Sequence, residues 1–477
     1  MEDEGDDEEE KPHSKARTPS ALFEGWVLLF TMFAAGIGGT FQYGYNLTII
    51  NAPTTHIQKF VNETWLERYG SELDSWVITL IWSIIVSVFP LGGFMGALLA
   101  GPMAIRLGRK KSLLFNNLFI ILSAIFCGLS RYAKSFEMII LGRILAGVNS
   151  GVSMCIQPMY LGESAPRKLR GTGALSCAVS TAIGLVMGQV VGLREILGSE
   201  EVWPLLLASN VTPGIIQLMV LPWVPESPRY LLIDLKDKDS CVVALRRLRG
   251  NCDFTSEMEE MMAEQTAIQG QRPKSLCELI QDPSLRRQLL TIVVLSSAMQ
   301  LCGNDSMYFY ASYVFQAAGI SSEKIQYVVI GTGSCELLTS ITCGHITWIP
   351  YLSMVCIFAY ILSFGIGPAG VTGLMPAEIF DQMARPAAYM ICGSLMWLIL
   401  FVVGLAFPFI VQGLGHFCFM PFLVVCVCTT LYIGFFLPET KGKSVLEITE
   451  EFTRCKAKPH REENGYLGAQ EIKSTSL

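Results

Sequence analysis

The chain has 477 residues, of which 51% are hydrophobic and only 16% are charged, with a formal net charge of −6. Soluble domains carry about 25% charged residues, so this composition excludes a soluble globular enzyme and a disordered chain. The long stretches without charge also exclude a nucleic-acid-binding protein that works through a basic surface patch. The composition therefore indicates a polytopic membrane protein.

Most of the charged residues fall in three segments, 1–24, 226–288 and 438–477. The first segment is an acidic tail that we expect to be solvated. Between the charged segments lie stretches that are apolar throughout, and roughly 20 such residues suffice for a helix to cross a bilayer. We expect spanning helices at 25–49, 76–100, 113–130, 136–161, 172–193, 203–224, 288–315, 325–343, 349–376, 387–411 and 415–437.

Basic residues in the short loops predict the orientation of these helices. Lys and Arg gather after the second helix, after the fourth helix and in the central block, which places the N-terminus in the cytoplasm. Arg131, Lys134 and Arg194 fall on the opposite side and weaken this signal. The N-glycosylation acceptor Asn62, in the first outer loop, agrees with the orientation.

The sequence contains an internal repeat. Glu163 is followed by Arg170 after the fourth helix, and Glu378 is followed by Arg385 at the same spacing in the second half. Two helical halves that pack around a site at the middle of the membrane are typical of a secondary transporter.

The two halves also end alike, with Pro-Glu-Ser around Glu226 and Pro-Glu-Thr around Glu439. We therefore divide the chain into segments. These are an acidic cytoplasmic tail (1–24), an N-terminal transmembrane half (25–225), a cytoplasmic helical linker (226–287), a C-terminal transmembrane half (288–437) and a cytoplasmic tail (438–477).

The second half is too short for a full copy of the first. About 30 residues, roughly one helix and a loop, are missing near 343–349 after the longer first outer loop is taken into account. The second half then has five helices where the first has six. An odd total would place the C-terminal tail outside. Alternatively, 325–376 folds as one long or re-entrant element and keeps that tail in the cytoplasm.

Several motifs resemble those of the sugar porters of the major facilitator superfamily, in particular the fructose-type subclass of animal facilitated glucose transporters. The motifs are Gln42-Tyr43-Gly44-Tyr45-Asn46, Arg106-Leu107-Gly108-Arg109-Lys110, Gly142-Arg143, Tyr160-Leu161-Gly162-Glu163-Ser164-Ala165-Pro166, Pro225-Glu226-Ser227-Pro228-Arg229 and Pro438-Glu439-Thr440-Lys441-Gly442. The resemblance implies an all-helical major facilitator fold with two pseudo-symmetric halves. It also implies facilitative transport of glucose, fructose or both across the plasma membrane by alternating access.

Some positions differ from the pattern of that family. The motif in the seventh helix keeps one glutamine, Gln300, and has Asp305 where the family has asparagine. Glu336 replaces an asparagine of the eighth helix, and Gly373 replaces the tryptophan of glucose-selective members. These changes resemble a subclass with altered substrate preference.

A sugar presents hydroxyl groups that donate and accept hydrogen bonds, so its site requires neutral amides, hydroxyls and aromatic faces. Polar residues within apolar helices either bind such a ligand or hydrogen-bond a neighbouring helix. The ionisable residues among them are candidates for sugar binding, proton coupling or a buried pair, and Trp397 either lines the cavity or anchors the helix at the interface. The candidates for substrate binding are Gln42, Asn46, Gln189, Gln300, Asn304, Asp305, Glu336, Gly373 and Trp397.

The first helix carries no acid between Gly25 and Asn51. Proton-coupled sugar porters that resemble this chain carry an aspartate there, so its absence favours a uniporter.

Charged residues at the cytoplasmic face are expected to form a lock that closes when the cavity opens outward. Positive-inside topology and helix capping would explain the arginines alone, but not the acids at equal spacing in both halves. The residues of this predicted gate are Arg106, Arg109, Arg143, Glu163, Arg170, Glu226, Arg229, Glu378, Arg385 and Glu439.

No Ser-His-Asp set, metal-ligating cluster or phosphate loop occurs in the sequence, so we expect no enzymatic activity and no cofactor or metal. The expected partners are a small-molecule hexose and the lipid bilayer, and not nucleic acid. The sequence carries no signal for the oligomeric state. The alternative function is that of a shortened, non-transporting isoform that acts as a sensor or a regulatory partner.

Overall fold

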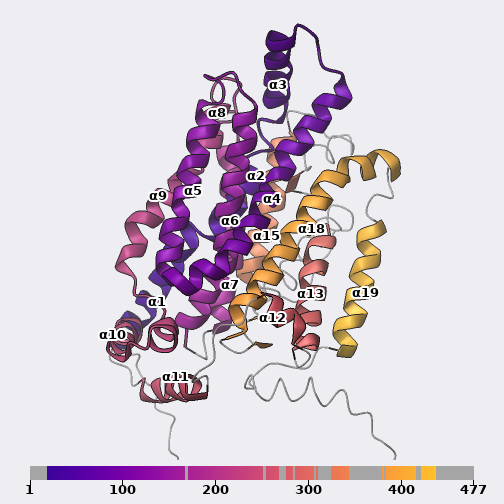
Figure 1. Cartoon of the computed structure of the whole chain (residues 1–477). Coiled ribbons are helices and arrows are strands. Elements are labelled where there is room, and N and C mark those ends of the chain that lie inside the picture. The colour runs from indigo at the N-terminus through magenta and orange to yellow at the C-terminus, as the bar shows by residue number, and fades with distance from the viewer. Residues whose placement is uncertain are drawn as a thin grey trace, which may run out of the picture.

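The computed structural model describes residues 19–166, 170–250, 254–267, 276–282, 285–303, 305, 308–309, 324–342, 375–376, 379–380, 383–414 and 420–436. These residues form a bundle of helices without a strand among them, as expected (Figure 1). Within this part of the chain, six helical stretches are long and apolar enough to cross a membrane. They are Trp26–Thr48, Ser75–Leu107, Arg109–Leu129, Glu137–Ser164, Trp203–Trp223 and Arg385–Phe407.

The elements of the first half follow one another with short connections. They are α1 (Pro19–Ile37), α2 (Thr40–Thr48), α3 (Thr54–Tyr69), α4 (Ser75–Leu107), α5 (Arg109–Leu129), α6 (Glu137–Ser164), α7 (Arg170–Val191), α8 (Trp203–Ala208), α9 (Val211–Val220) and the 3₁₀ turn η2 (Leu221–Trp223).

The remaining elements form the linker and the second half. They are the π-helical turn η3 (Tyr230–Asp234), α10 (Lys238–Arg249), α11 (Thr255–Ala267), α12 (Leu276–Gln281), α13 (Arg286–Leu301), α15 (Ile325–Thr342), α18 (Arg385–Leu414) and α19 (Met420–Phe436).

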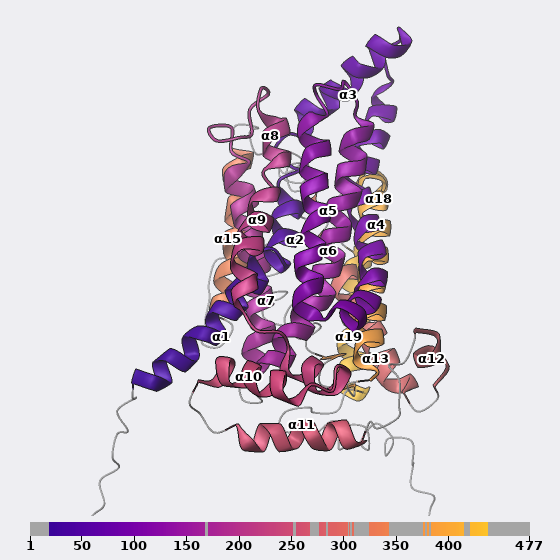
Figure 2. The same ribbon diagram turned by 60° about the vertical axis from the view of Figure 1, so that its left-hand side comes forward.

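The bundle has two distinct ends. Figure 2 shows α3 and α8 at one end and α10, α11 and α12 at the other. We refer to them as the α3 end and the α10 end.

The expected first spanning helix is broken into α1 and α2. The break falls at Gly38 and Gly39, where the side-chain amide oxygen of Gln157 accepts a hydrogen bond from the Thr40 N–H at 2.6 Å. A Cβ atom at Gly39 would overlap that amide oxygen. The glycine pair and a polar side chain inserted from α6 therefore account for the bend, because a group that enters the backbone ladder kinks a helix.

Helices α4 and α6 approach each other backbone to backbone. A Cβ atom at Gly92 would overlap the carbonyl oxygen of Ile144, and one at Gly96 would overlap that of Val148. From the opposite side, Gly147 faces the carbonyl oxygen of Phe89 in the same way. Small residues that permit such close approach drive helix association in membranes, where no hydrophobic force acts between helices.

Helix α18 of the second half packs along a different face of α4 (Figure 1). The indole ring of Trp397 occupies the space that a side chain at position 93 would fill, and the Met390 side chain does so at Gly101. This contact, which we call the seam, is one of those that join the two halves in the described part of the chain.

The expected first span is present as the helical stretch Trp26–Thr48, which bends between α1 and α2. The first outer loop contains α3, whose apolar side chains Ile57 and Val61 are buried against the bundle. The expected span 349–376 lies outside the described residues.

The close contact between α4 and α6 predicts the effect of a larger side chain at Gly147. Gly147→Leu forces the helices apart, and such overpacking typically costs about 1–3 kcal/mol. We expect the purified variant to unfold at a lower temperature in detergent. Gly162→Leu on the same helix is the control, because a Cβ atom there meets nothing within 4 Å. An equal loss of stability in both variants would contradict the packing argument.

Candidate functional site

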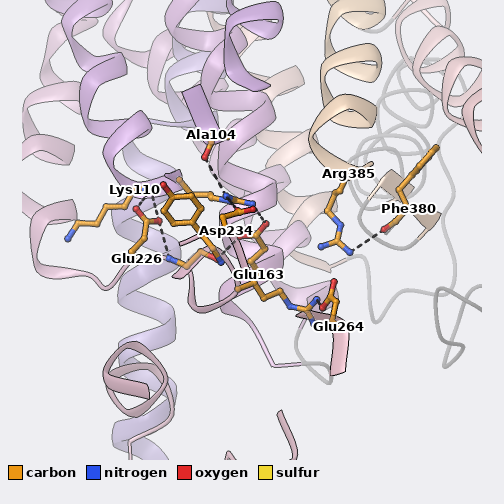
Figure 3. A network of polar contacts seen from close by, with 12 residues as sticks. Ala104, Lys110, Glu163, Glu226, Asp234, Glu264, Phe380 and Arg385 are labelled. Atoms are coloured by element: carbon orange, nitrogen blue, oxygen red, sulfur yellow. Dashed lines mark hydrogen bonds and ion pairs between the residues drawn. The ribbon is translucent and has the colours of Figure 1, made fainter. Parts of the chain in front are cut away.

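A network of buried charges lies at the α10 end (Figure 3). Arg109, the first residue of α5, is 1% exposed and pairs with two carboxylates. Its Nη2 lies 2.9 Å from Oε1 of Glu163 on α6, and its Nη1 lies 2.8 Å from Oδ2 of Asp234 on η3. The guanidinium also lies over the ring of Tyr230, 4.8 Å from the centroid. One arginine thus joins α5, α6 and the start of the linker.

The carboxylate of Glu226 binds the N-terminus of α5. Its two oxygens accept the backbone N–H of Lys110 at 3.0 and 3.2 Å, and one also accepts the N–H of Ser227. An acid at this position satisfies a free backbone donor and interacts favourably with the helix dipole. The Pro-Glu-Ser motif therefore holds the end of the first half against the α4–α5 turn.

Burial raises the pKa of the carboxyl groups of Asp234 and Glu226. The guanidinium of Arg109 acts in the opposite direction on both, and the backbone N–H of Lys110 does so on Glu226. The ionised state of these two acids therefore depends on their contacts within the network.

The linker helices attach to this network through further ion pairs. Arg229 binds Oε2 of Glu264 on α11 at 2.6 Å. Arg249 at the end of α10 forms a two-point contact with Glu257, at 2.7 and 3.0 Å, and donates to the carbonyl oxygen of Ser164 at 2.9 Å. These contacts hold α10 and α11 against the end of α6.

The second half contributes Arg385, the first residue of α18, to the same end. Its side chain is buried and donates to the carbonyl oxygen of Phe380 at 3.2 Å (Figure 3). The Arg385 charge interacts unfavourably with the guanidinium of Arg229 and favourably with the carboxylates of Glu264 and Glu163. A cation of the second half thus lies at the same end as the acids of the first half and the linker.

The structure brings Arg109, Glu163, Glu226, Arg229 and Arg385 of the predicted gate together. Arg106 is exposed on the last turn of α4. Glu378, Glu439 and the side chain of Arg170 lie outside the described residues.

Sequence reasoning missed Asp234, Ser227 and Tyr230 as members of the network. Ser227 donates its hydroxyl proton to Oε2 of Glu163. The available signal was Asp234 itself, an acid that ends the apolar run Tyr230–Asp234 shortly after the Pro-Glu-Ser motif.

Arg143 does not join the network. It lies on α6 near the α3 end, and the 20 residues between it and Glu163 correspond to about 30 Å of helix. Its Nη1 donates to the carbonyl oxygen of Asn46 at 2.8 Å, and its guanidinium lies over the Phe89 ring, 4.5 Å from the centroid. The structure thus places Arg143 inside the first half and away from the predicted gate.

A second group of polar and aromatic residues lies at the seam. The Tyr43 hydroxyl of α2 donates to Oδ2 of Asp305 at 3.1 Å, which joins the two halves. The Trp397 ring meets the rings of Tyr43 and Phe89 edge-on, with centroids 5.3 and 5.6 Å apart. Tyr43 was missed as a candidate, although it stands within the quoted Gln-Tyr-Gly-Tyr-Asn motif.

Gln300 is the predicted substrate ligand with the most unusual surroundings. It stands near the end of α13, just before Gly303, whose φ of +87° ends the helix. Its side chain is 2% exposed, and neither its amide oxygen nor its amide nitrogen has a hydrogen-bond partner in the described structure. The indole nitrogen of the fully buried Trp397 likewise has no hydrogen-bond partner in the described structure.

Gln42 and Asn46 take part in helix contacts within the first half. The Gln42 amide nitrogen donates to the carbonyl oxygen of Asn210, and the Asn46 amide oxygen accepts from the Asn210 side chain at 3.2 Å. These contacts are the helix–helix hydrogen bonds that formed the alternative interpretation of the two residues.

The other predicted residues are more scattered. Gln189, at the end of α7, lines a cavity at the α3 end, which Asn62 on α3 also lines. The Asn62 side-chain oxygen accepts the N–H of Leu73 at 3.2 Å. Asn304, Gly373 and the side chain of Glu336 lie outside the described residues.

Comparison with known proteins places these features in a family. The family model described as "Sugar (and other) transporter" matches residues 31–343 and 327–452. The human solute carrier family 2, facilitated glucose transporter member 11 is 56% identical over 490 residues, covering 96% of this chain and 99% of the relative. Member 5 from horse is 40% identical over 462 residues, covering 90% and 92%. These relatives are transporters and not enzymes.

Solved structures show the same fold at low sequence identity. The proton:xylose symporter XylE bound to 6-bromo-6-deoxy-D-glucose matches with a TM-score of 0.75 and 19% identity, covering 90% of this chain and 99% of XylE. The inward-open form of XylE from E. coli matches with a TM-score of 0.65 and 20% identity over the same shares. The chain therefore belongs to the sugar transporter family and has the major facilitator superfamily fold.

Proposed function

We propose that this protein moves a hexose, glucose or fructose, across the plasma membrane by uniport. The observation that carries the proposal is the buried amide of Gln300 near the end of α13, with both polar atoms unpartnered in the described structure. Leaving such a group without a partner costs about 1–3 kcal/mol. A ligand hydroxyl that donates to the amide oxygen and accepts from the amide nitrogen removes this cost.

Two polar groups at the seam also suit a neutral polyol. The indole nitrogen of Trp397 offers one more donor, and the Asp305 carboxylate offers an acceptor for hydroxyl protons. The names of the relatives at 56% and 40% identity, facilitated glucose transporters, support a hexose as the ligand. Uniport is supported by the absence of any acid between Gly25 and Asn51.

The proposed mechanism is alternating access, with the charge network at the α10 end as the lock on one side. The lock connects α5, α6 and the linker through Arg109, Glu163 and Asp234, and Arg385 of α18 lies at the same end. Its basic residues support a cytoplasmic position for the α10 end and for the N-terminus. The sugar must bind without strongly favouring either end state, because a strong preference would slow the return step.

We also propose that the second half lacks about one helix near 343–349. The alignment with the human relative runs over 490 positions although this chain has 477 residues, so that relative has residues without a counterpart here. The two matches to the family model overlap at 327–343, next to the proposed gap.

Uptake of labelled fructose and glucose by liposomes that contain the purified chain tests the proposed function. Without any ion or pH gradient, we expect saturable uptake that unlabelled hexose competes with. An imposed pH gradient should leave the initial rate unchanged. No uptake by correctly inserted protein would overturn the proposal and favour the non-transporting, regulatory function.

The role of Gln300 predicts a specific kinetic change. Gln300→Ala removes one or two hydrogen bonds to a neutral ligand, each worth about 0.5–1.5 kcal/mol, so the KM for hexose should rise roughly 3- to 100-fold. Gln288→Ala is the matched control, because Gln288 is equally buried on the same helix but lies three turns away. Equal kinetics of Gln300→Ala and the unaltered protein would contradict the assignment.

The lock predicts that Glu163→Gln opens the α10 end. Loss of one partner from a buried ion pair costs up to about 3–5 kcal/mol. Cys155 reports the change, because its thiol is buried against the carbonyl oxygen of Tyr389 across the seam, at 3.6 Å. We expect faster alkylation of Cys155 in Glu163→Gln, measured by peptide mass spectrometry. Glu137→Gln, at an exposed pair with Arg68, should not change it. Unchanged alkylation in both variants would rule out the lock.

A further inference from the structure

A cavity of about 580 Å³ lies at the α3 end, between helices of both halves. Its wall is formed by α2, α3, α4 and the end of α7 on one side and by the start of α15 on the other. Most of the side chains that line it are neutral hydrogen-bonding groups, among them Asn51, Thr55, Gln58, Thr79, Gln189 and Gln326.

Gln189 is a buried polar residue at the wall of this cavity. Its side chain is 8% exposed, and neither its amide oxygen nor its amide nitrogen has a hydrogen-bond partner in the described structure. The amide packs on Gly333 of α15, where a Cβ atom would overlap the Gln189 amide oxygen. The missing side chain at position 333 thus leaves room for this amide at the wall of the cavity.

The charges around the cavity do not favour an ionic ligand. No acidic side chain is among the described residues that line it. The ammonium group of Lys59 binds Oε1 of Glu200 at 2.6 Å, which compensates its charge, and Arg194 is exposed. A ligand with many hydroxyl groups and no charge fits this chemistry, because amides both donate to and accept from hydroxyls.

This cavity is distinct from the group at the seam. Tyr43, Gln300, Asp305 and Trp397 do not line it. Thr48 of α2 does, and it stands five residues beyond Tyr43, which corresponds to about 7 Å along a helix. The cavity therefore lies more than one helical turn closer to the α3 end than the seam group.

We propose that this cavity is a second, outer subsite for neutral sugars, in which the Gln189 amide hydrogen-bonds the hydroxyl groups of a hexose before it reaches the seam. The proposal rests on hexose transport as the proposed function. The volume of the cavity lies within the range of about 300–1,000 Å³ that is typical of small-molecule sites. The seam and the outer subsite are then occupied in sequence by a sugar that enters from the α3 end.

Protection of an introduced cysteine tests the subsite directly. Thr55→Cys places a thiol on an exposed position that lines the cavity, and Ser71→Cys places one on an exposed position outside it. The labelling rate of each purified protein with a small polar maleimide is measured with and without hexose, against betaine at the same osmolarity. We expect hexose to slow labelling of Thr55→Cys several-fold and to leave Ser71→Cys unchanged.

Three further variants in the Thr55→Cys background assign the protection to one of the two sites. We expect it to persist with Gln300→Ala and to disappear with Gln189→Leu. Gly333→Ala, which displaces the Gln189 side chain, should weaken it as well. Replacing an unpartnered buried amide by an apolar group of similar size is nearly neutral or stabilising, so Gln189→Leu should unfold at an unchanged or higher temperature.

Loss of protection with Gln300→Ala to the same extent as with Gln189→Leu would overturn the outer subsite, because the cysteine would then report binding at the seam. Absence of protection in every background would also overturn it. The uptake measurement would still decide the proposed function in both cases, so the two failures can be told apart.

Discussion

The close approach of α4 and α6 is the constraint on which the rest of the structure depends. Lipid chains are as apolar as leucine, so these helices gain little from hiding apolar side chains from the bilayer. Gly92, Gly96 and Gly147 instead let two backbones touch, which increases the dispersion contacts between them. The position of α6 then fixes Glu163 at one end and Arg143 near the other.

The buried polar groups divide into those that hold the bundle together and those that lack partners. Gln157 binds the broken backbone at Thr40, and Gln42 and Asn46 bind Asn210. These amides stabilise contacts within the first half. Gln300 on α13 and Gln189 in the outer cavity have no such partner in the described structure, and Gln189 stands where α7 meets α15 of the second half. A carrier that must release its ligand benefits from amides that are held in place by packing and not by internal hydrogen bonds.

Much of the fold could be predicted from the sequence, because apolar length and the positions of basic residues determine which segments cross a bilayer. The helices α5, α6 and α7 begin and end within a few residues of the expected spans, whereas α4 begins as expected and continues past residue 100 to Leu107. Two features could not be read in this way. The amphipathic signal of α3 is weak, and the bend at Gly38–Gly39 depends on Gln157 from a helix more than one hundred residues away.

The candidate site was predicted less completely, for a physical reason. Repeated motifs revealed that Glu163, Glu226 and Arg385 have related positions, but a repeat does not specify partners. The structure pairs Glu163 with Arg109 and Arg229 with Glu264. Asp234 belongs to the turn η3, whose side-chain directions follow from its π-helical geometry, so an α-helical pattern could not place it beside Arg109.

The contact between α4 and α18 has a mechanical consequence. The side chains of Trp397 and Met390 on α18 pack into the spaces left by Gly93 and Gly101 on α4. In the proposed alternating access, both side chains must leave these spaces together when the halves rock apart. Partial withdrawal of the side chains loses dispersion contacts without gaining new ones. Such an interface favours two well-defined relative positions of the halves over a continuous range of positions, as expected for packed interfaces that switch. One bulky ring opposite one missing side chain would thus make the proposed movement of the two halves stepwise.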